Sequence, residues 1–113
     1  MHTLITARHV DLTPEQKQYA EDKLSKLTKY YDLVQEIEVI VEQAEHAQFH
    51  VEVIVTAEHH NRFIANCTCD KIESCIDSCF GKLERQITEH KNRHRNRKHP
   101  VGGADASIRH SAV

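Results

Sequence analysis

The chain has 113 residues, a formal net charge of −2 and 28% charged residues, which is typical of one soluble globular domain. No apolar run approaches the roughly 20 residues of a membrane span, and the N-terminus lacks the ordered regions of a signal peptide. We therefore expect a cytoplasmic domain that is large enough to fold without a metal or a disulfide.

The charges are unevenly distributed along the chain. Residues 1–81 contain 7 Lys and Arg against 14 Asp and Glu, whereas residues 82–99 contain 7 against 2. Such segregation can mark a nucleic-acid surface even when the net charge is small.

The first elements are a strand and a helix. Residues 3–10 predict a short strand, with alternate side chains on its two faces. The helix is predicted over residues 12–32, because Thr13 is a natural N-cap, Pro14 suits the first helical position and Gln16 completes a capping box. Its apolar stripe consists of Tyr19, Leu24, Leu27 and Tyr31, and three lysines flank the stripe: Lys23, Lys26 and Lys29.

Three strands and a second helix follow. Residues 36–44, 48–58 and 62–70 alternate between apolar and polar, and the short connection between the first two predicts an antiparallel hairpin. Residues from about 70 to about 92 or beyond predict a helix, with Ile72, Ile76, Cys79, Leu83 and Ile87 on one face.

The order β-α-β-β-β-α predicts an α+β two-layer sandwich, a four-stranded mixed sheet with two helices on one face. The helical connection makes the first two strands parallel in this scheme. We assign residues 1–95 to this domain. We expect residues 96–113 to be a basic extension and a disordered tail, because this segment contains Pro100 and a Gly pair.

The four cysteines form a C-x-C-x5-C-x3-C cluster: Cys67, Cys69, Cys75 and Cys79. They could converge into a zinc site. Because all four lie on or beside predicted buried faces, we favour their interpretation as core thiols and assign no metal. A redox role is the remaining alternative.

The other candidates for chemistry are weak. His90 and His94 have the i,i+4 spacing of a metal-binding pair, but in a run of Lys and Arg we interpret them as part of a phosphate-facing surface. Nucleotide-binding and hydrolase motifs are absent. We therefore expect neither an enzyme nor a small-molecule substrate, and no cofactor.

Basic side chains could share one layer if the two helices lie side by side. In the second helix they are Lys82, Arg85, Lys91, Arg93 and Arg95. The open face of the sheet would carry Glu36, Glu38, Glu42 and Glu52. This arrangement predicts a protein that is basic on the helix side and acidic on the sheet side.

Three segments resemble the ribosome hibernation-promoting factors, a family also labelled ribosome-associated inhibitor A and sigma-54 modulation proteins: "ARHVDLTP", "KLSKLTKYYD" and "KLERQITEHK". The resemblance covers roughly residues 1–95 and fits the short type. It implies a fold similar to double-stranded-RNA-binding domains. It also implies binding to small-subunit rRNA in the channel for messenger and transfer RNA, at the A and P sites, which inhibits translation in stationary phase or stress.

The rRNA-facing positions of the family match Arg8, Lys23, Lys26, Lys29, Lys82, Arg85, His90 and Lys91. We expect a monomer when free, and contacts to folded rRNA by shape. A general double-stranded-RNA-binding module is the alternative.

The sequence departs from the usual family pattern at several positions. Ala7 replaces a glycine of the "GRHV"-like turn, Glu73 replaces an aromatic residue, and Glu89 stands where a basic residue is common. Three of the cysteines fall where the family often has alanine, which favours the core interpretation.

Overall fold

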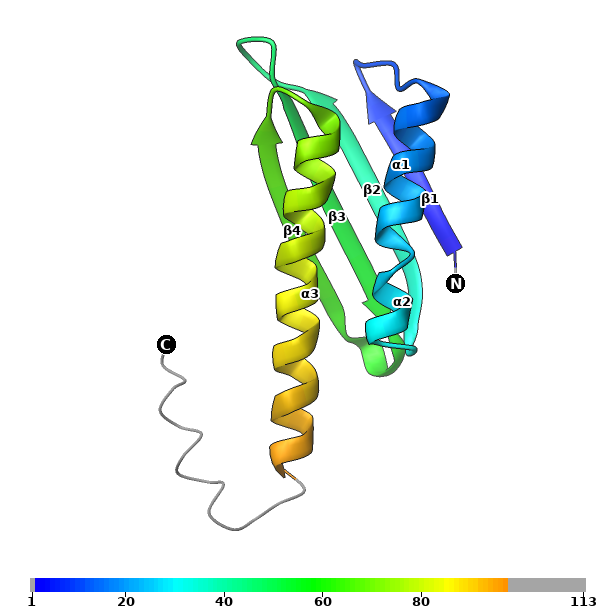
Figure 1. The fold of residues 1–113 in the computed structure, drawn as a ribbon, viewed down its shortest axis with the longest axis vertical. Coiled ribbons are helices and arrows are strands. Elements are labelled where there is room, and N and C mark those ends of the chain that lie inside the picture. The colour runs from blue at the N-terminus through cyan, green and yellow to red at the C-terminus, as the bar shows by residue number, and fades with distance from the viewer. Residues whose placement is uncertain (1, 98–113) are drawn as a thin grey trace.

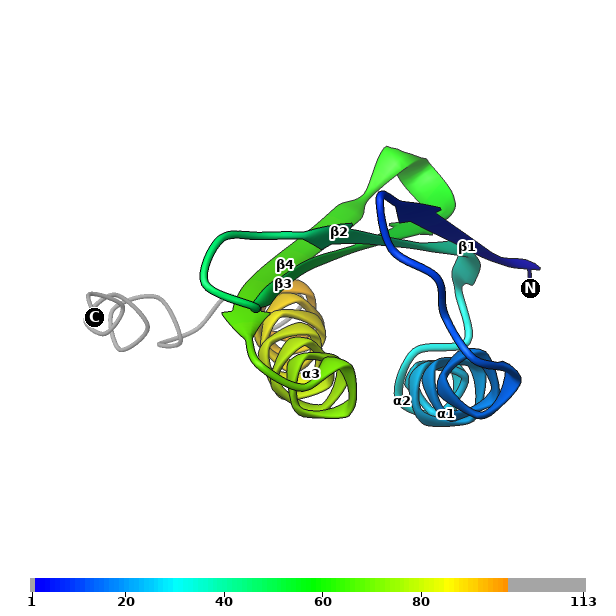
Figure 2. The same ribbon diagram turned by 90° about the horizontal axis from the view of Figure 1, so that it is seen from above.

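The computed structural model describes residues 2–97 as a sheet layer covered on one face by helices (Figures 1 and 2). The predicted fold class is confirmed. In chain order the elements are β1 (His2–Arg8), α1 (Pro14–Leu24), α2 (Leu27–Tyr30), β2 (Val34–Gln43), β3 (Phe49–Ala57), a 3₁₀ turn (Glu58–His60), β4 (Arg62–Cys69) and α3 (Ile72–Arg97).

The four strands lie in the order β1-β2-β3-β4. β1 pairs parallel with β2, with Leu4 opposite Glu38, and the connection between them runs through α1 and α2. β2–β3 and β3–β4 are antiparallel pairs, so residues 34–69 form a meander. The predicted hairpin and the parallel first pair are both confirmed.

The helix predicted over residues 12–32 is two helices in the structure. The chain tightens after Leu24, where the Lys26 amide donates to the Lys23 carbonyl in an i→i−3 bond of 3.3 Å. The Ser25 hydroxyl donates to the Asp22 carbonyl at 3.0 Å, and the Thr28 hydroxyl donates to the Ser25 carbonyl at 2.7 Å. Serine and threonine compete for helix carbonyls in this way. The tightened turn separates α1 from α2, which continues in nearly the same direction (Figure 1).

The start of α1 is confirmed in detail. Thr13 Oγ1 accepts from the Gln16 amide at 3.1 Å, and Gln16 Oε1 accepts from the Thr13 amide at 3.0 Å. This reciprocal pair is a capping box, which satisfies two amides that the first turn of a helix leaves without intrahelical partners.

Three turns require left-handed backbone, and one of them is the β3–β4 turn, where His59 has φ 67° and His60 has φ 61°. His9, directly after β1, has φ 59°. In the β2–β3 hairpin both His46 and Ala47 have φ 59°, and the Gln48 amide donates to the Glu45 carbonyl at 3.2 Å. Two central residues with positive φ match a type I′ turn, which follows the twist of the strands. Ala7 lies within β1 opposite Val41, so the left-handed position of the "ARHV" segment is His9.

The core lies between the helices and the covered face of the sheet. Alternate strand residues such as Val39, Val53 and Ala65 face the helices, and α3 covers them with Ile76 and Leu83, which are fully or almost fully buried. Burying a branched aliphatic side chain contributes about 1.5–3 kcal/mol, so this contact face is what holds α3 in place.

α3 also closes the outer edge of β4. Lys82 Nζ donates to the Asn66 carbonyl at 2.7 Å, and Gln86 Nε2 donates to the Ile64 carbonyl at 2.8 Å. The two donors are one helical turn apart, and the two acceptors are two residues apart on the strand. Both contacts fix the helix along the strand and occupy edge carbonyls that could otherwise pair with another chain.

The extent of α3 agrees with the prediction of a helix to about residue 92 or beyond. The helix continues to Arg97 and extends past the end of the sheet (Figure 1). The basic extension assigned to residues 96–113 therefore begins inside this helix, and its part from residue 98 onward lies outside the described residues. No helix within residues 2–97 is long and apolar enough to cross a membrane.

Candidate nucleic-acid interface

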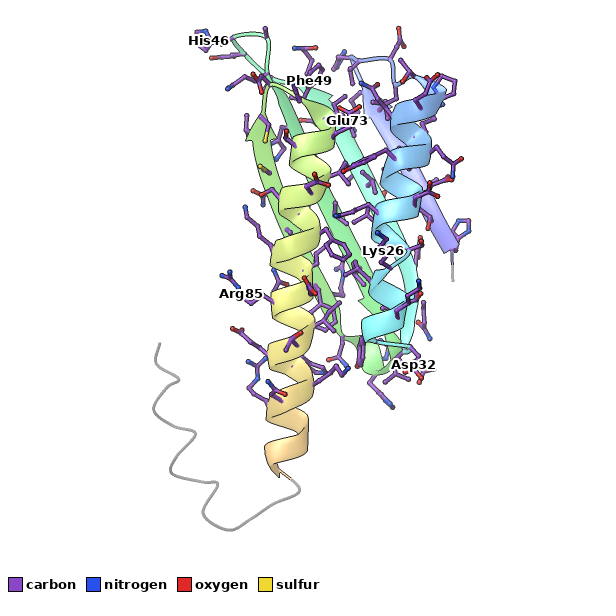
Figure 3. The ribbon with its side chains drawn as sticks, in the orientation of Figure 1. Lys26, Asp32, His46, Phe49, Glu73 and Arg85 are labelled. Atoms are coloured by element: carbon purple, nitrogen blue, oxygen red, sulfur yellow. The ribbon has the colours of Figure 1, made fainter. Side chains whose placement is uncertain are left out.

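Six exposed cations lie on the helix layer between the middle of α3 and the end where α2 packs beside the second half of α3. We call this group the basic end, and its members are Lys26, Lys29, Lys82, Arg85, Lys91 and Arg93. Figure 3 shows Lys26 and Arg85 near the middle of the molecule, and Glu73 closer to the end where α3 begins. The expectation that both helices contribute cations to one layer is met.

The cations of α3 lie on two flanks. Helical spacing places Lys82 and Arg85 on the flank beside β4, in agreement with the bond from Lys82 to Asn66. Lys91 falls on the opposite flank, toward α2. In Figure 3 Arg85 points away from α2. The basic end is therefore a broad surface that wraps around α3 rather than two parallel rows of charge.

Acidic residues occupy the other half of α3. Glu73 and Asp77 lie on the side that faces α1, and the Tyr19 hydroxyl donates to Asp77 at 2.5 Å. The hydrogen bond to Asp77, followed by burial, raises the pKa of Tyr19. Within α3 the charge thus changes from acidic to basic along the helix axis, a gradient that the predicted contrast between the helix side and the sheet side did not include.

Lys23 belongs to the contact between α1 and α3. Its Nζ lies 3.8 Å from Asp77 Oδ1 and 5.0 Å from the centre of the Phe80 ring. The side chain is partly buried between the helices. Asp77 balances its charge in the free protein, whereas Lys26 and Lys29 are exposed to solvent. Sequence reasoning missed Phe80 and Asp77 as partners, although both fall on the α1-facing side of α3 at helical spacing.

Arg8 lies on the opposite face of the molecule. The strand register places it beside Glu42 on the open face of the sheet, and Arg8 Nη1 lies 3.2 Å from Glu42 Oε2. The pair is exposed, so it contributes little to stability. Arg8 is therefore separated from the basic end by the sheet, and its register with Glu42 also places it at the opposite end of the strands.

We expected His90 to point outward toward phosphate, but in the structure it does not. Its ring packs edge-on against Tyr31 at 5.8 Å and against Phe63 at 5.5 Å, measured between ring centres. It is half-buried because it follows the core stripe of α3 one turn after Ile87. The side chain of Arg95 lies outside the described part of the structure.

The open face of the sheet carries the predicted acids, and apolar residues lie among them. One row across the sheet consists of Leu4, Glu38, Ile54 and Ile64. Leu4 is 43% exposed and Ile64 is 44% exposed. The acidic part of the expected charge contrast is confirmed, and it lies on the face that the helices leave open (Figure 2).

The cysteines only partly match the core interpretation. Cys75 and Cys79 are fully buried, whereas Cys67 and Cys69 are half-buried. Burial raises the pKa of Cys75 and raises that of Cys79 to about 12. The Sγ atoms of Cys67, Cys69 and Cys75 all lie within 4.8 Å of one another. Two of the four thiols thus behave as core residues, and three of the four meet in one cluster.

Comparison with known proteins agrees with this fold. The chain is 28% identical to the ribosome hibernation promoting factor of Azotobacter vinelandii, over 96% of this chain and 99% of that protein. It is 30% identical to the factor of the same name from Escherichia coli strain K12, over 82% of this chain and 96% of that one.

A solved structure of a ribosomal subunit interface protein from Coxiella burnetii superposes on this chain with a TM-score of 0.74 and 24% sequence identity. The superposition covers 81% of this chain and 99% of that one, so the two folds are alike. The model of the family described as Sigma 54 modulation protein / S30EA ribosomal protein matches residues 3–95. The chain belongs to this family.

Proposed function

We propose that the protein is a cytoplasmic ribosome hibernation factor. It binds small-subunit rRNA in the channel for messenger and transfer RNA, at the A and P sites, and inhibits translation in stationary phase or stress. Two relatives named ribosome hibernation promoting factors, matched over most of the chain, support the general role. The basic end is the single structural observation that carries the binding mode.

The six side chains of the basic end are exposed, so they can reach phosphates without rearrangement of the core. Each phosphate neutralised by a lysine or arginine releases counterions, which favours binding at low salt. A surface that wraps around a helix suits the backbone and 2′-hydroxyl groups of folded RNA, which are recognised by shape. Inhibition is then by occupancy, and it requires no catalytic group.

The remaining candidates contribute differently in this proposal. Lys23 and His90 hold α3 against α1 and α2, and so fix the position of the basic end. Arg8 would contact rRNA only if the channel also encloses the sheet face. Arg95 would extend the surface along α3. The free protein is a monomer in this proposal.

A sucrose gradient of stationary-phase extract tests the proposal. We expect the protein to sediment with ribosomal particles at low salt, and a salt wash to move it to the free fraction. The variant Lys17→Glu should still sediment with ribosomal particles, because Lys17 is an exposed lysine of α1 outside the basic end. Protein found only in the free fraction at low salt would refute ribosome binding.

A competition assay then tests the place of binding. Purified small subunits are first filled with messenger RNA and transfer RNA, and the protein is added afterwards. Binding in the channel predicts that the filled subunits exclude the protein, whereas empty subunits bind it. Equal affinity for a plain RNA duplex and for empty subunits would instead identify a general double-stranded-RNA-binding module.

A further inference from the structure

Three thiols converge at the end of β4, on the side covered by α3. Cys67 and Cys69 are two residues apart, so they point to the same face of the strand, and their Sγ atoms are 3.2 Å apart. Cys75 lies near the start of α3 and approaches the Cys67 carbonyl with its Sγ at 3.6 Å. All three Sγ atoms lie within 4.8 Å of one another.

We propose that Cys67, Cys69 and Cys75 form a three-thiolate binding site for one soft metal ion, Zn²⁺ or Cu⁺. Thiolate ligands select these ions over hard cations such as Mg²⁺ and Ca²⁺. None of the three cysteines belongs to the basic end, and the inference does not rest on the proposed function.

The spacing of the sulfur atoms suits such an ion. A zinc–sulfur bond of about 2.3 Å places two sulfurs of a tetrahedral site about 3.8 Å apart. The observed pair at 3.2 Å and the upper limit of 4.8 Å differ from this value by no more than about 1 Å. Small rotations of the cysteine side chains cover that difference.

The surroundings allow an ion to enter and to be held. Cys67 and Cys69 are half-buried and border solvent, whereas Cys75 is fully buried. The Lys82 ammonium bonds to the carbonyl of Asn66, next to Cys67, so a positive charge lies near the site. Phe49 marks this end of the molecule in Figure 3, and its carbonyl lies 3.8 Å from the Cys75 sulfur.

Binding replaces three thiol protons. Each Cys Sγ–H bond breaks, one metal–sulfur bond forms in its place, and the three protons pass to solvent. No electrons are transferred. A water molecule can complete the tetrahedron around Zn²⁺, whereas Cu⁺ is satisfied by the three sulfurs. The bound ion joins β4 to α3 across the turn at Asp70 and Lys71.

Cys79 provides an internal control. It lies one helical turn after Cys75, is fully buried, and approaches the Val51 carbonyl with its Sγ at 3.8 Å. Among the described residues the converging group contains only the other three cysteines. Cys79→Ala removes a thiol from the chain without removing a ligand of the proposed site.

The experiment uses the reduced full chain and Co²⁺ as a spectroscopic probe. We expect a near-ultraviolet thiolate-to-cobalt charge-transfer band that saturates at one ion per chain and disappears when Zn²⁺ is added. This band distinguishes thiolate ligands from the ten histidines of the chain. Titration of Cu⁺ against a coloured chelator shows which ion binds more tightly.

The variants determine the outcome. Cys69→Ser should weaken Co²⁺ binding by more than about tenfold, because one of the three sulfur ligands is lost, whereas Cys79→Ala should retain the affinity of the wild type. Circular dichroism of both variants confirms folding. The proposal is overturned by the absence of a charge-transfer band in the reduced protein, or by equal losses in the two variants. A Cys67–Cys69 disulfide that forms in air while the reduced protein takes up no metal would also overturn it.

Discussion

Reversing two charges of the basic end is the most direct test of the binding surface. Lys82→Glu combined with Arg85→Glu places two acids on the flank of α3 beside β4, where both native side chains are exposed. The expected result is much weaker binding to small ribosomal subunits by a domain that remains folded.

The magnitude follows from counterion release. Each cation that contacts phosphate adds about 0.9 to the slope of log K against log salt, which at about 0.1 M salt is about eightfold in affinity. The double variant should therefore lose about sixtyfold and its salt slope should fall by about 1.8. Stability should fall by about 1 kcal/mol, because Lys82 loses its bond to the Asn66 carbonyl.

The assay is co-sedimentation with purified small subunits at several concentrations between about 0.05 and 0.3 M salt. Lys17→Glu is the matched control, because Lys17 is an exposed side chain of α1. It should retain both the affinity for small subunits and the salt slope. An unchanged slope in the double variant, or an equal loss in the control, would show that this flank does not contact phosphate. A melting temperature lowered by more than about 8 °C would mean that the assigned helix face is wrong.

Three further predictions concern the fold. Ala47→Gly should stabilise the protein by about 0.5–1 kcal/mol in urea unfolding, because Ala47 has φ 59° in the hairpin turn; a loss of stability would contradict the type I′ assignment. Thr13→Ala should cost about 1 kcal/mol in the same assay, because the capping box is lost, and an unchanged midpoint would refute its role. Tyr19 should titrate above its usual pKa of 10.0 by ultraviolet absorbance, because its hydroxyl donates a hydrogen bond to Asp77. The stability from this raised pKa is present below about pH 10 and is lost as the pH rises through the folded value. Asp77→Ala should reduce the upward shift, because burial and Glu73 still raise the pKa without it.

Local signals in the sequence predicted most of the fold. The alternation in β2 and β3, the capping box at Thr13 and the apolar stripe of α3 each depend on near neighbours, so they were readable without the tertiary structure. The break after Leu24 was missed because Ser25 and Thr28 compete for backbone carbonyls without a glycine or proline to mark the position.

The candidate site was predicted less completely, since it depends on which side chains meet. The spacing of Lys82 and Arg85 placed both residues outside the core. Periodicity could not show that Asp77 and Phe80 engage Lys23, or that His90 packs against Tyr31 and Phe63. These contacts join elements far apart in the sequence, and their partners are fixed only when α1 and α3 dock.

The projection of α3 past the sheet has an electrostatic consequence. From His90, which still packs against Phe63, to Arg97 the helix advances by about 10 Å. That length is close to the screening distance of about 8 Å at physiological salt. Beyond this screening distance, the electric field of the glutamates on the sheet is strongly attenuated. The projecting helix therefore allows one small, nearly neutral protein to present a local positive potential that its own acidic body does not cancel.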